Sequence, residues 1–154
     1  AEAFINGINT CDDKYVVYRV HRPITDLKHM LKTSVELHPD NVAFMQRFVK
    51  GEPFRKITYT EAYHDINGLG TAMIDHGLQG KRIAVIGENC YQWASTYLAI
   101  TGGTGIVVPL DKELGEEELK QLVIDAEASA VFFTKKFKDI FKRVKSLSML
   151  QKLL

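Results

Sequence analysis

Three short runs of apolar residues divide the second half of the chain. The runs are Ile83–Ile86, Ile106–Val108 and Val131–Phe133. Their length and lack of polar alternation are typical of strands that are covered on both faces. The segments between them carry helical patterns and are long enough for the crossovers that parallel strands require. The pattern therefore predicts that these three runs are parallel neighbours in one sheet.

Helical spacing governs the segment after the first of these strands. Asn89 and Gln92 form the pattern of a capping box, in which side chains satisfy the free amides of a helix start. The residues that recur at helical spacing are Trp93, Ala94, Tyr97, Leu98 and Thr101. The glycines within 102–105 then predict the end of the helix, because glycine tolerates left-handed backbone.

Two more helices are predicted towards the end of the chain. The first opens with three glutamates at 116–118, and its inward residues are Leu119, Leu122, Val123 and Ala126. The second covers Lys135 to Leu154, with an apolar stripe of Phe137, Ile140, Phe141, Val144 and Leu147. Its opposite side carries Lys135, Lys136, Lys138, Lys142, Arg143 and Lys145. This basic face fits either a solvated surface or contact with an anionic membrane.

The first half of the chain has a different pattern. Residues 1–22 have no clear period and are interpreted as an arm, in which 15–18 could form a short edge strand. A helix is predicted after Pro23, with Pro39 as its stop and one stripe formed by Leu27, Met30, Leu31 and Val35. The segments 42–49 and 55–59 flank a Lys-Gly-Glu-Pro turn, which indicates a hairpin.

A helix capped by Thr60 follows the hairpin. Its inner face is Ala62, Ile66, Leu69 and Met73, and Gly77 ends it. Gly68 and Gly70 lie inside this helix and each costs on the order of 1 kcal/mol relative to alanine, which close packing against a strand would offset.

These elements predict an α/β fold: a parallel sheet with helices on both faces, plus an antiparallel hairpin. We interpret residues 23–154 as one α/β subdomain.

Composition narrows the function classes. The 154 residues are 45% hydrophobic with a net charge of +1, so overall charge gives no reason to expect a nucleic-acid partner. No pair of histidines has helical metal-ligand spacing, and Cys11 and Cys90 are far apart, so we expect no metal site and a reducing, cytoplasmic location. The uncharged stretch 89–110 contains glycines and a proline, so it is interpreted as buried helix and strand rather than a membrane span.

The familiar phosphate-binding motifs are absent from the chain. It has neither a Walker A loop nor a dinucleotide-binding glycine motif after the strand at 83–86. The glycines at 102–105 follow a helix, which is the wrong polarity for an anion site. Ligands of parallel sheets bind beyond the carboxyl ends of the strands, where Glu88 and Asp111 could act as acid or base. Asn89 and Trp93 are interpreted as cap and core, with pocket lining as the alternative. Two carboxylates do not establish a site, so no catalytic, cofactor-binding or metal-binding residue is assigned.

The order and spacing of several short motifs resemble the N-terminal part of the AMP-forming acyl-CoA synthetases, within the adenylate-forming superfamily. The resemblance covers about Leu27 to Phe133. The motifs are Ile57-Thr58-Tyr59, the run 77–85, Glu88-Asn89 with Trp93, Tyr97-Leu98-Ala99, the run 107–111, and Glu118-Leu119. The run 87–93 looks most like the long-chain fatty acid branch. Lys81 and Asp111 depart from the residues common in the family.

This resemblance implies that the chain is the opening portion of a longer ligase. The parent would activate a fatty acid with ATP and Mg²⁺ as an acyl-adenylate and transfer the acyl group to CoA. The family's phosphate loop and catalytic lysine match no position here, so the chain alone is expected to be inactive. A homodimer is left open. The alternatives are a stand-alone α/β binding or assembly module and, less favoured, a small nucleotide-binding enzyme.

Overall fold

The structure is a computed structural model and describes residues 23–147 and 152–153. The predicted arm, with Cys11 and the residues 15–18, lies outside the described residues. The elements in chain order are α2 (Leu27–Leu37), β1 (Val42–Gln46), β2 (Arg55–Thr58), α3 (Tyr59–Asp75), β3 (Arg82–Ile86), α4 (Tyr91–Ala99), the π-helical turn η1 (Ile100–Thr104), β4 (Ile106–Pro109), α5 (Glu116–Asp125), β5 (Ala130–Phe133), the 3-10 turn η2 (Lys135–Phe137), α6 (Lys138–Leu147) and β6 (Lys152–Leu153).

The larger sheet contains the three predicted strands as parallel neighbours. Its order is β4-β3-β5-β6, so β3 is central, and Ile83 pairs with Val107 on one side and Ala130 on the other. Four of the five β3 residues are buried, whereas β4 lies at the edge and exposes Ile106. This arrangement confirms the predicted sheet.

The end of the chain departs from the expected single helix over 135–154. A 3-10 turn precedes α6, and Lys152–Leu153 forms a fourth parallel strand beside Ala130 and Val131. The helical prediction was therefore wrong at 152–153, because the open edge of β5 offers backbone partners to a returning segment. Phe137 and Phe141 of the predicted apolar stripe are buried as expected, while the side chains of Val144, Lys145 and Leu147 lie outside the described part.

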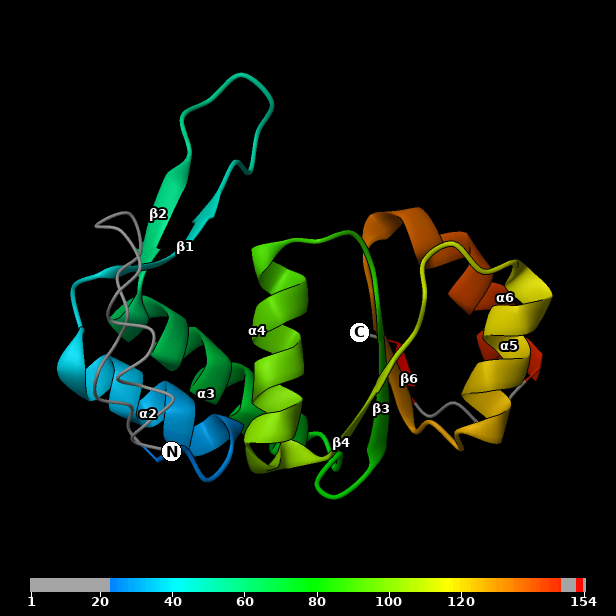
Figure 1. Cartoon of the computed structure of the whole chain (residues 1–154). Helices are drawn as coiled ribbons and strands as arrows, with labels where there is room; N and C mark the ends of the chain where they lie inside the picture. Colours follow the sequence, from blue (N-terminus) through cyan, green and yellow to red (C-terminus); the bar gives the residue numbers. More distant parts are fainter. Residues whose placement is uncertain (1–22, 148–151, 154) are drawn as a thin grey trace, which may run out of the picture.

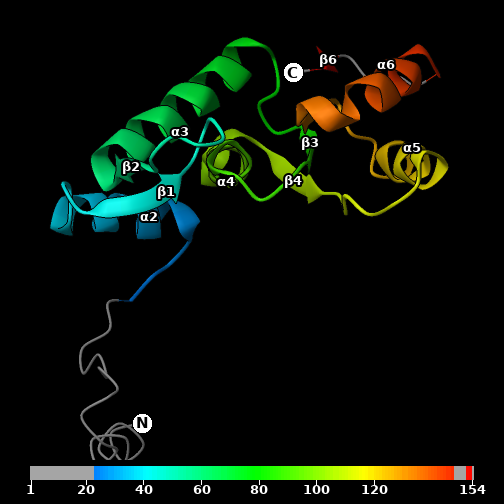
Figure 2. The same cartoon turned by 90° about the horizontal axis from the view of Figure 1, so that it is seen from above.

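Helices cover both faces of this sheet, as predicted (Figure 2). Alternate strand residues face opposite ways, so the core has two main parts. On one face Ile83, Val85 and Ala130 join α3 and α4, and on the other Ala84, Ile86 and Val131 join α5 and η2–α6.

The hairpin forms its own two-stranded antiparallel sheet, as predicted. Phe44 pairs with Ile57, and a register shift lies between Val42 and Phe44. Ile57, Ala62 and Tyr91 form a small third core beneath it, and the rest of the hairpin projects away from the body (Figure 1). Gly51 has φ +94°, which explains why glycine occupies the connecting turn.

In the structure, the N-caps of α3 and α4 are not the predicted residues but residues one or two positions away. The cap of α3 is Thr58, not Thr60, because β2 runs directly into the helix and Glu61 completes a capping box with Thr58. Thr60 instead donates to the Pro39 carbonyl. The cap of α4 is Cys90, not Asn89: its Sγ accepts from the Trp93 amide at 3.4 Å. The Cys90 side chain is half-buried.

The buried side of α4 also differs from the predicted stripe. The buried residues are Tyr91, Ser95, Thr96 and Ala99, whereas Trp93, Ala94, Tyr97, Leu98 and Thr101 are all half-buried. The reason is that α4 lies between the sheet and α3, so small residues occupy the tight contact. A side chain at Gly70 of α3 would place its Cβ 3.0 Å from Thr104 Oγ1 and 3.7 Å from the Ala99 carbonyl. The close packing predicted for Gly70 is thus against α4 and η1, not a strand.

Other inward assignments change as well. Leu122 of α5 is 41% exposed, and Leu69 of α3 is half-buried. The glycine-rich end of α4 is confirmed in part: the helix passes through η1, and Gly103 has the left-handed φ of +124°.

Candidate functional site

The carboxyl ends of β3, β4 and β5 lie at one edge of the sheet, because these strands are parallel. We call this the carboxyl edge; it comprises residues 87–90, 110–113 and 134–136. Two backbone bonds hold it together: the Thr134 amide donates to the Ile86 carbonyl at 3.2 Å, and the Leu110 amide donates to the Val85 carbonyl at 3.0 Å. This is where parallel sheets commonly bind ligands.

Glu88 is the best-defined polar group at this edge. Its Oε2 accepts from the Thr134 hydroxyl at 2.6 Å. That bond, a backbone hydrogen bond and the nearby charges of Lys136 and Lys112 lower the pKa of Glu88 below its ordinary value. The carboxylate is therefore ionised at neutral pH, which suits attraction of a positive group and does not suit a general acid.

The loop that carries Glu88 approaches β5 closely. A Cβ on Gly87 would lie 2.4 Å from Thr134 Cγ2, so any larger residue there would displace Thr134. Glycine at this position follows from the packing that brings Glu88 and Thr134 together.

A small cavity of about 200 Å³ opens beside this pair, between the sheet and α4. Its wall is largely apolar and consists of Val85, Ile86, Gln92, Trp93, Thr96, Phe132, Phe133 and Thr134. The Thr96 hydroxyl already donates to the Gln92 carbonyl, so it offers little to a ligand.

The start of α4 is tied to the hairpin rather than free for an anion. Gln46 Oε1 accepts from the Tyr91 amide, and Gln46 Nε2 donates to Gln92 Oε1 at 3.0 Å. With Cys90 accepting from the Trp93 amide, two donors of the first turn are in use. The Tyr91 hydroxyl donates to Asp65 at 2.7 Å, and burial followed by that bond raises its pKa.

The predicted candidates separate in the structure. Glu88 lies at the carboxyl edge, whereas Asp111 is exposed and caps its own turn by accepting from the Glu113 amide. No hydrogen bond joins Glu88 to Asp111 within the described part of the chain. Trp93 does line the cavity, as its alternative interpretation allowed, while Asn89 is exposed and lines a separate depression near the hairpin. Sequence reasoning missed Thr134 and Gln46, whose partners lie 46 and 45 residues away.

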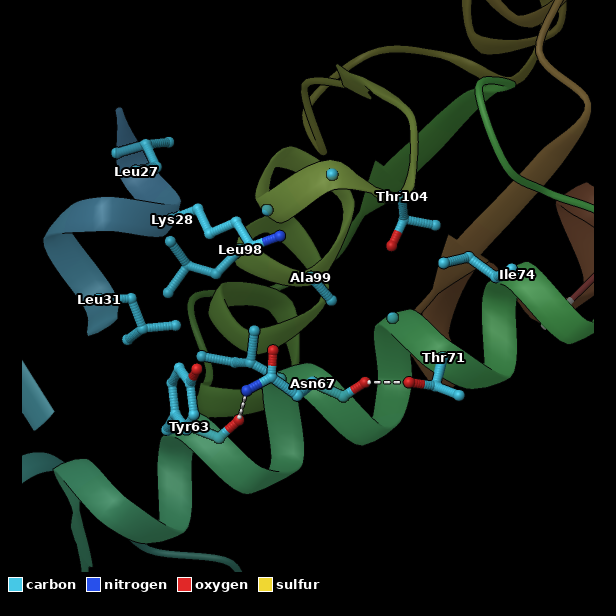
Figure 3. Close-up of a pocket in the computed structure, with 14 residues that line it drawn as sticks. Leu27, Lys28, Leu31, Tyr63, Asn67, Thr71, Ile74, Leu98, Ala99 and Thr104 are labelled. Atoms are coloured by element: carbon cyan, nitrogen blue, oxygen red, sulfur yellow. Dashed lines mark hydrogen bonds between the residues drawn. The ribbon is translucent and has the colours of Figure 1, made fainter. Parts of the chain in front are cut away.

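A second cavity lies between α2, α3, the end of α4 and η1 (Figure 3). It has a volume of about 210 Å³ and includes Lys28, Tyr63, Asn67, Thr71 and Thr104 in its wall. Asn67 Nδ2 donates to the Tyr63 carbonyl and the Thr71 hydroxyl donates to the Asn67 carbonyl, so part of its polar lining is used within α3. Lys28 lies beside η1, where a positive charge favours the carbonyl end of a helix.

Neither a metal cluster nor a membrane-spanning helix is present in the described ranges. No three His, Cys, Asp or Glu residues converge there as metal ligands. No helix of that part is long and apolar enough to cross a bilayer.

Comparison with known proteins identifies the family. The model of the AMP-binding enzyme family matches residues 31–153. The chain belongs to this family. It is 34% identical over 113 residues to long chain acyl-CoA synthetase 1 of Arabidopsis thaliana, which covers 71% of the chain and 17% of that protein. It is 28% identical over 143 residues to long chain acyl-CoA synthetase 5 of the same plant, covering 90% of the chain and 19% of that protein.

A solved structure supports the same architecture. A protein described as a long-chain-fatty-acid CoA ligase from Rhodopseudomonas palustris superposes with a TM-score of 0.72 at 24% identity, covering 83% of the chain and 32% of that structure. The chain thus spans less than a fifth of the curated relatives above. AMP-binding enzymes are AMP-forming ligases.

Proposed function

We propose that this chain forms the opening subdomain of an ATP-dependent ligase that activates a long-chain fatty acid as its acyl-adenylate and then transfers the acyl group to CoA. In the first step a fatty-acid carboxylate oxygen bonds to the α-phosphorus of ATP and pyrophosphate leaves. In the second step the CoA thiol attacks the acyl carbonyl and AMP leaves. Residues 23–154 would be one part of a larger adenylation domain.

The observation that carries the proposal is the family match over 31–153, together with two relatives named as long chain acyl-CoA synthetases. The fold supports the proposal, because the three long strands of its sheet are parallel and sheets of this kind commonly bind ligands beyond the carboxyl ends of their strands. Nothing in the site geometry selects the acyl chain, so its length rests on the relatives alone.

The described residues do not fit ATP and Mg²⁺ by themselves. A triphosphate needs backbone donors and cations, and Mg²⁺ prefers several oxygen ligands. At the carboxyl edge, the ionised Glu88 would repel phosphate, and the Tyr91 and Trp93 amides are already bonded. We therefore assign no step of either reaction to a residue of this chain, and we propose that ATP, Mg²⁺ and CoA are bound by other parts of the parent protein.

A cytoplasmic location and membrane contact through the basic face at 135–145 stay predictions. A cytoplasmic location rests on cysteine usage alone. Membrane contact through the basic face of α6 rests on the charges at 135–145, of which Arg143 forms a bidentate pair with Glu116 at 2.6 Å. That pair lowers the pKa of Glu116, and it holds one of the six cations against the protein.

The test is ATP–pyrophosphate exchange with a panel of fatty acids of increasing chain length. Two proteins are compared: the 154-residue chain and the product of its source gene read past Leu154. We expect no exchange from the chain and exchange stimulated by long-chain acids from the longer product.

Fatty-acid-dependent exchange by the 154-residue chain would contradict its inactivity. A longer product that responds only to short or aromatic acids would contradict the long-chain assignment. A stop codon after Leu154, with calorimetric ATP binding by the chain, would favour the stand-alone binding module.

A further inference from the structure

The cavity between α2, α3, the end of α4 and η1 has a wall of mixed chemistry (Figure 3). Much of this wall is apolar and consists of Leu27, Leu31, Ile66, Ile74, Leu98 and Ala99. Among the described residues of the wall, Lys28 is the one charged residue, and none is acidic. The cavity lies between four elements of this chain, so its shape follows from how they pack together.

Thr104 contributes a buried hydroxyl to this cavity. The residue is 3% exposed, and its carbonyl accepts from the Gly80 amide at 2.7 Å, but no described residue forms a hydrogen bond with its hydroxyl. No side-chain oxygen of the described residues is both fully enclosed and without a partner, so the Thr104 oxygen opens onto the cavity rather than the packed core.

Neighbouring threonines show that this hydroxyl is an exception. The Thr71 and Thr101 hydroxyls each donate to a carbonyl four residues earlier, as threonines in helices commonly do. A buried hydroxyl without a partner lowers stability, so native structures retain few of them without a cause. A ligand in the cavity would supply the partner that Thr104 lacks.

Lys28 brings a positive charge to the same part of the wall. Its Nζ lies 3.8 Å from the position that a Cβ on Gly103 would take, and Gly103 is the residue before Thr104. No ion pair or hydrogen bond joins the Lys28 amino group to another described residue, whereas Lys32 of α2 lies 3.9 Å from Glu36. The carbonyl end of η1 explains the position of the charge but not that of the hydroxyl.

These groups select a class of ligand. An ammonium group and a hydroxyl both donate hydrogen bonds to a carboxylate, and bonds to a charged group are the stronger kind. The apolar side chains favour a ligand with a compact apolar body. A neutral molecule would leave the charge of Lys28 unpaired, and inorganic phosphate would leave the apolar wall without contacts.

We propose that this cavity binds a small organic carboxylate, with the carboxylate held by Lys28 and Thr104 and the apolar body against Leu31 and Leu98. The cavity shares no residue with the carboxyl edge, and binding requires neither ATP nor CoA. Failure of this proposal therefore leaves the proposed ligase activity standing, and failure of the ligase proposal leaves this one standing.

The test is titration of the full 154-residue chain with benzoate, followed by the backbone amide resonances in NMR spectra. We expect a dissociation constant of about 1 mM or tighter, with the largest shifts at Lys28 and at 102–104 and none at 87–90. Benzamide has the same shape without the charge, and inorganic phosphate has charge without the apolar body. Each should bind about tenfold more weakly than benzoate.

Paired variants test the charge. Lys28→Glu should weaken benzoate binding by about fivefold or more, because it replaces attraction by repulsion. Lys32→Glu is the matched control: it makes the same change on the same helix outside the wall and should leave binding within about twofold of the parent.

A second pair tests the hydroxyl. Thr104→Val keeps the shape of the side chain and should weaken binding by about fivefold. It removes no hydrogen bond among the described residues, so the melting temperature should not fall. Thr101→Val is the control on η1, which should keep binding within about twofold although it loses the bond to the Tyr97 carbonyl.

Calorimetry with the product of the source gene read past Leu154 tests the cavity in the parent protein. We expect benzoate binding that Lys28→Glu weakens and Lys32→Glu does not. Absence of this Lys28-dependent binding would overturn the site, because another part of the parent would then occupy or close the cavity. The proposal is also overturned if benzamide or phosphate binds as tightly as benzoate, if the shifts centre on 87–90, or if Thr104→Val lowers the melting temperature without weakening binding.

Discussion

Two β regions of this molecule place their apolar residues in opposite environments: one buries them and the other exposes them. In β3, Ile83–Ile86 are all at most 2% exposed, and strands pair with it on both sides. In the hairpin, only the base is packed, and residues 47–56 are all exposed although three of them are large and apolar. Apolar residues in β3 are explained by the core, whereas no described residue buries the apolar side chains of Phe48, Val49 and Phe54. The difference shows that an apolar residue in a β region need not belong to the buried core of the described residues.

The largest effect should come from β3. Ile83→Ala removes a fully buried side chain and should lower the free energy of unfolding by about 2–5 kcal/mol, because a cavity remains. Ile106→Ala makes the same change on the adjacent strand at a residue that is 56% exposed, and should cost about 0.5 kcal/mol or less. Urea denaturation of both variants measures the contrast, and equal losses would contradict the assignment of β3 as the central strand.

Trp93→Ala should have an intermediate effect. A fully buried tryptophan would cost about 3–5 kcal/mol, but Trp93 is half-buried and stacks on Tyr97 at 5.4 Å between ring centroids. We expect about 1–3 kcal/mol from chemical denaturation. A loss above that range would mean that Trp93 belongs to the core and leaves no room for the cavity beside Glu88.

Tyr91 connects the base of the hairpin with α4 and α3, and Tyr91→Phe tests this connection. Loss of the bond to Asp65 should cost about 0.5–1.5 kcal/mol at neutral pH. Because the pKa of Tyr91 is raised in the fold, its contribution is present below the ordinary tyrosine pKa of 10.0 and falls as pH rises above it. The variant should therefore lose less stability than the parent between neutral pH and pH above 10. Parallel pH profiles of the two proteins would count against this coupling.

Thr134→Val should change the acid response of the carboxyl edge. Without the hydroxyl, the pKa of Glu88 should rise towards its ordinary value, which a titration followed by NMR measures directly. In the parent the lowered pKa stabilises the fold above the ordinary glutamate pKa of 4.5, and this stabilisation is lost as pH falls through the folded-state pKa. The variant should lose less stability over that acid range. An unchanged Glu88 titration would show that Thr134 is not its main partner.

The smallest effect on stability is expected at the exposed end of the hairpin, residues 47–56. Phe54→Ser removes an exposed ring and one contact with Arg47, so the unfolding free energy should fall by less than about 1 kcal/mol. Thermal melting beside Ile83→Ala measures the difference within one chain. A loss comparable to that of Ile83→Ala would place residues 47–56 in the folding core.

The sequence by itself determined the elements and the type of sheet. Apolar runs such as Ile83–Ile86, separated by helical patterns, were sufficient for three parallel strands, and the turn at 50–53 was sufficient for the hairpin, because these signals are local and repeat with a fixed period. The resemblance to the ligase family also came from short motifs in order.

Only the tertiary structure decided which side chains meet. The bonds from Thr134 to Glu88 and from Tyr91 to Gln46 join residues that are 46 and 45 positions apart, and no local pattern encodes such pairs. The cap of α4 moved from Asn89 to Cys90, and its buried side moved to Ser95 and Ala99, because α3 packs closely there. The strand at Lys152–Leu153 likewise depends on the free edge of β5. Periodicity shows that a segment has a buried side, but the direction of that side depends on the neighbours that the complete fold supplies.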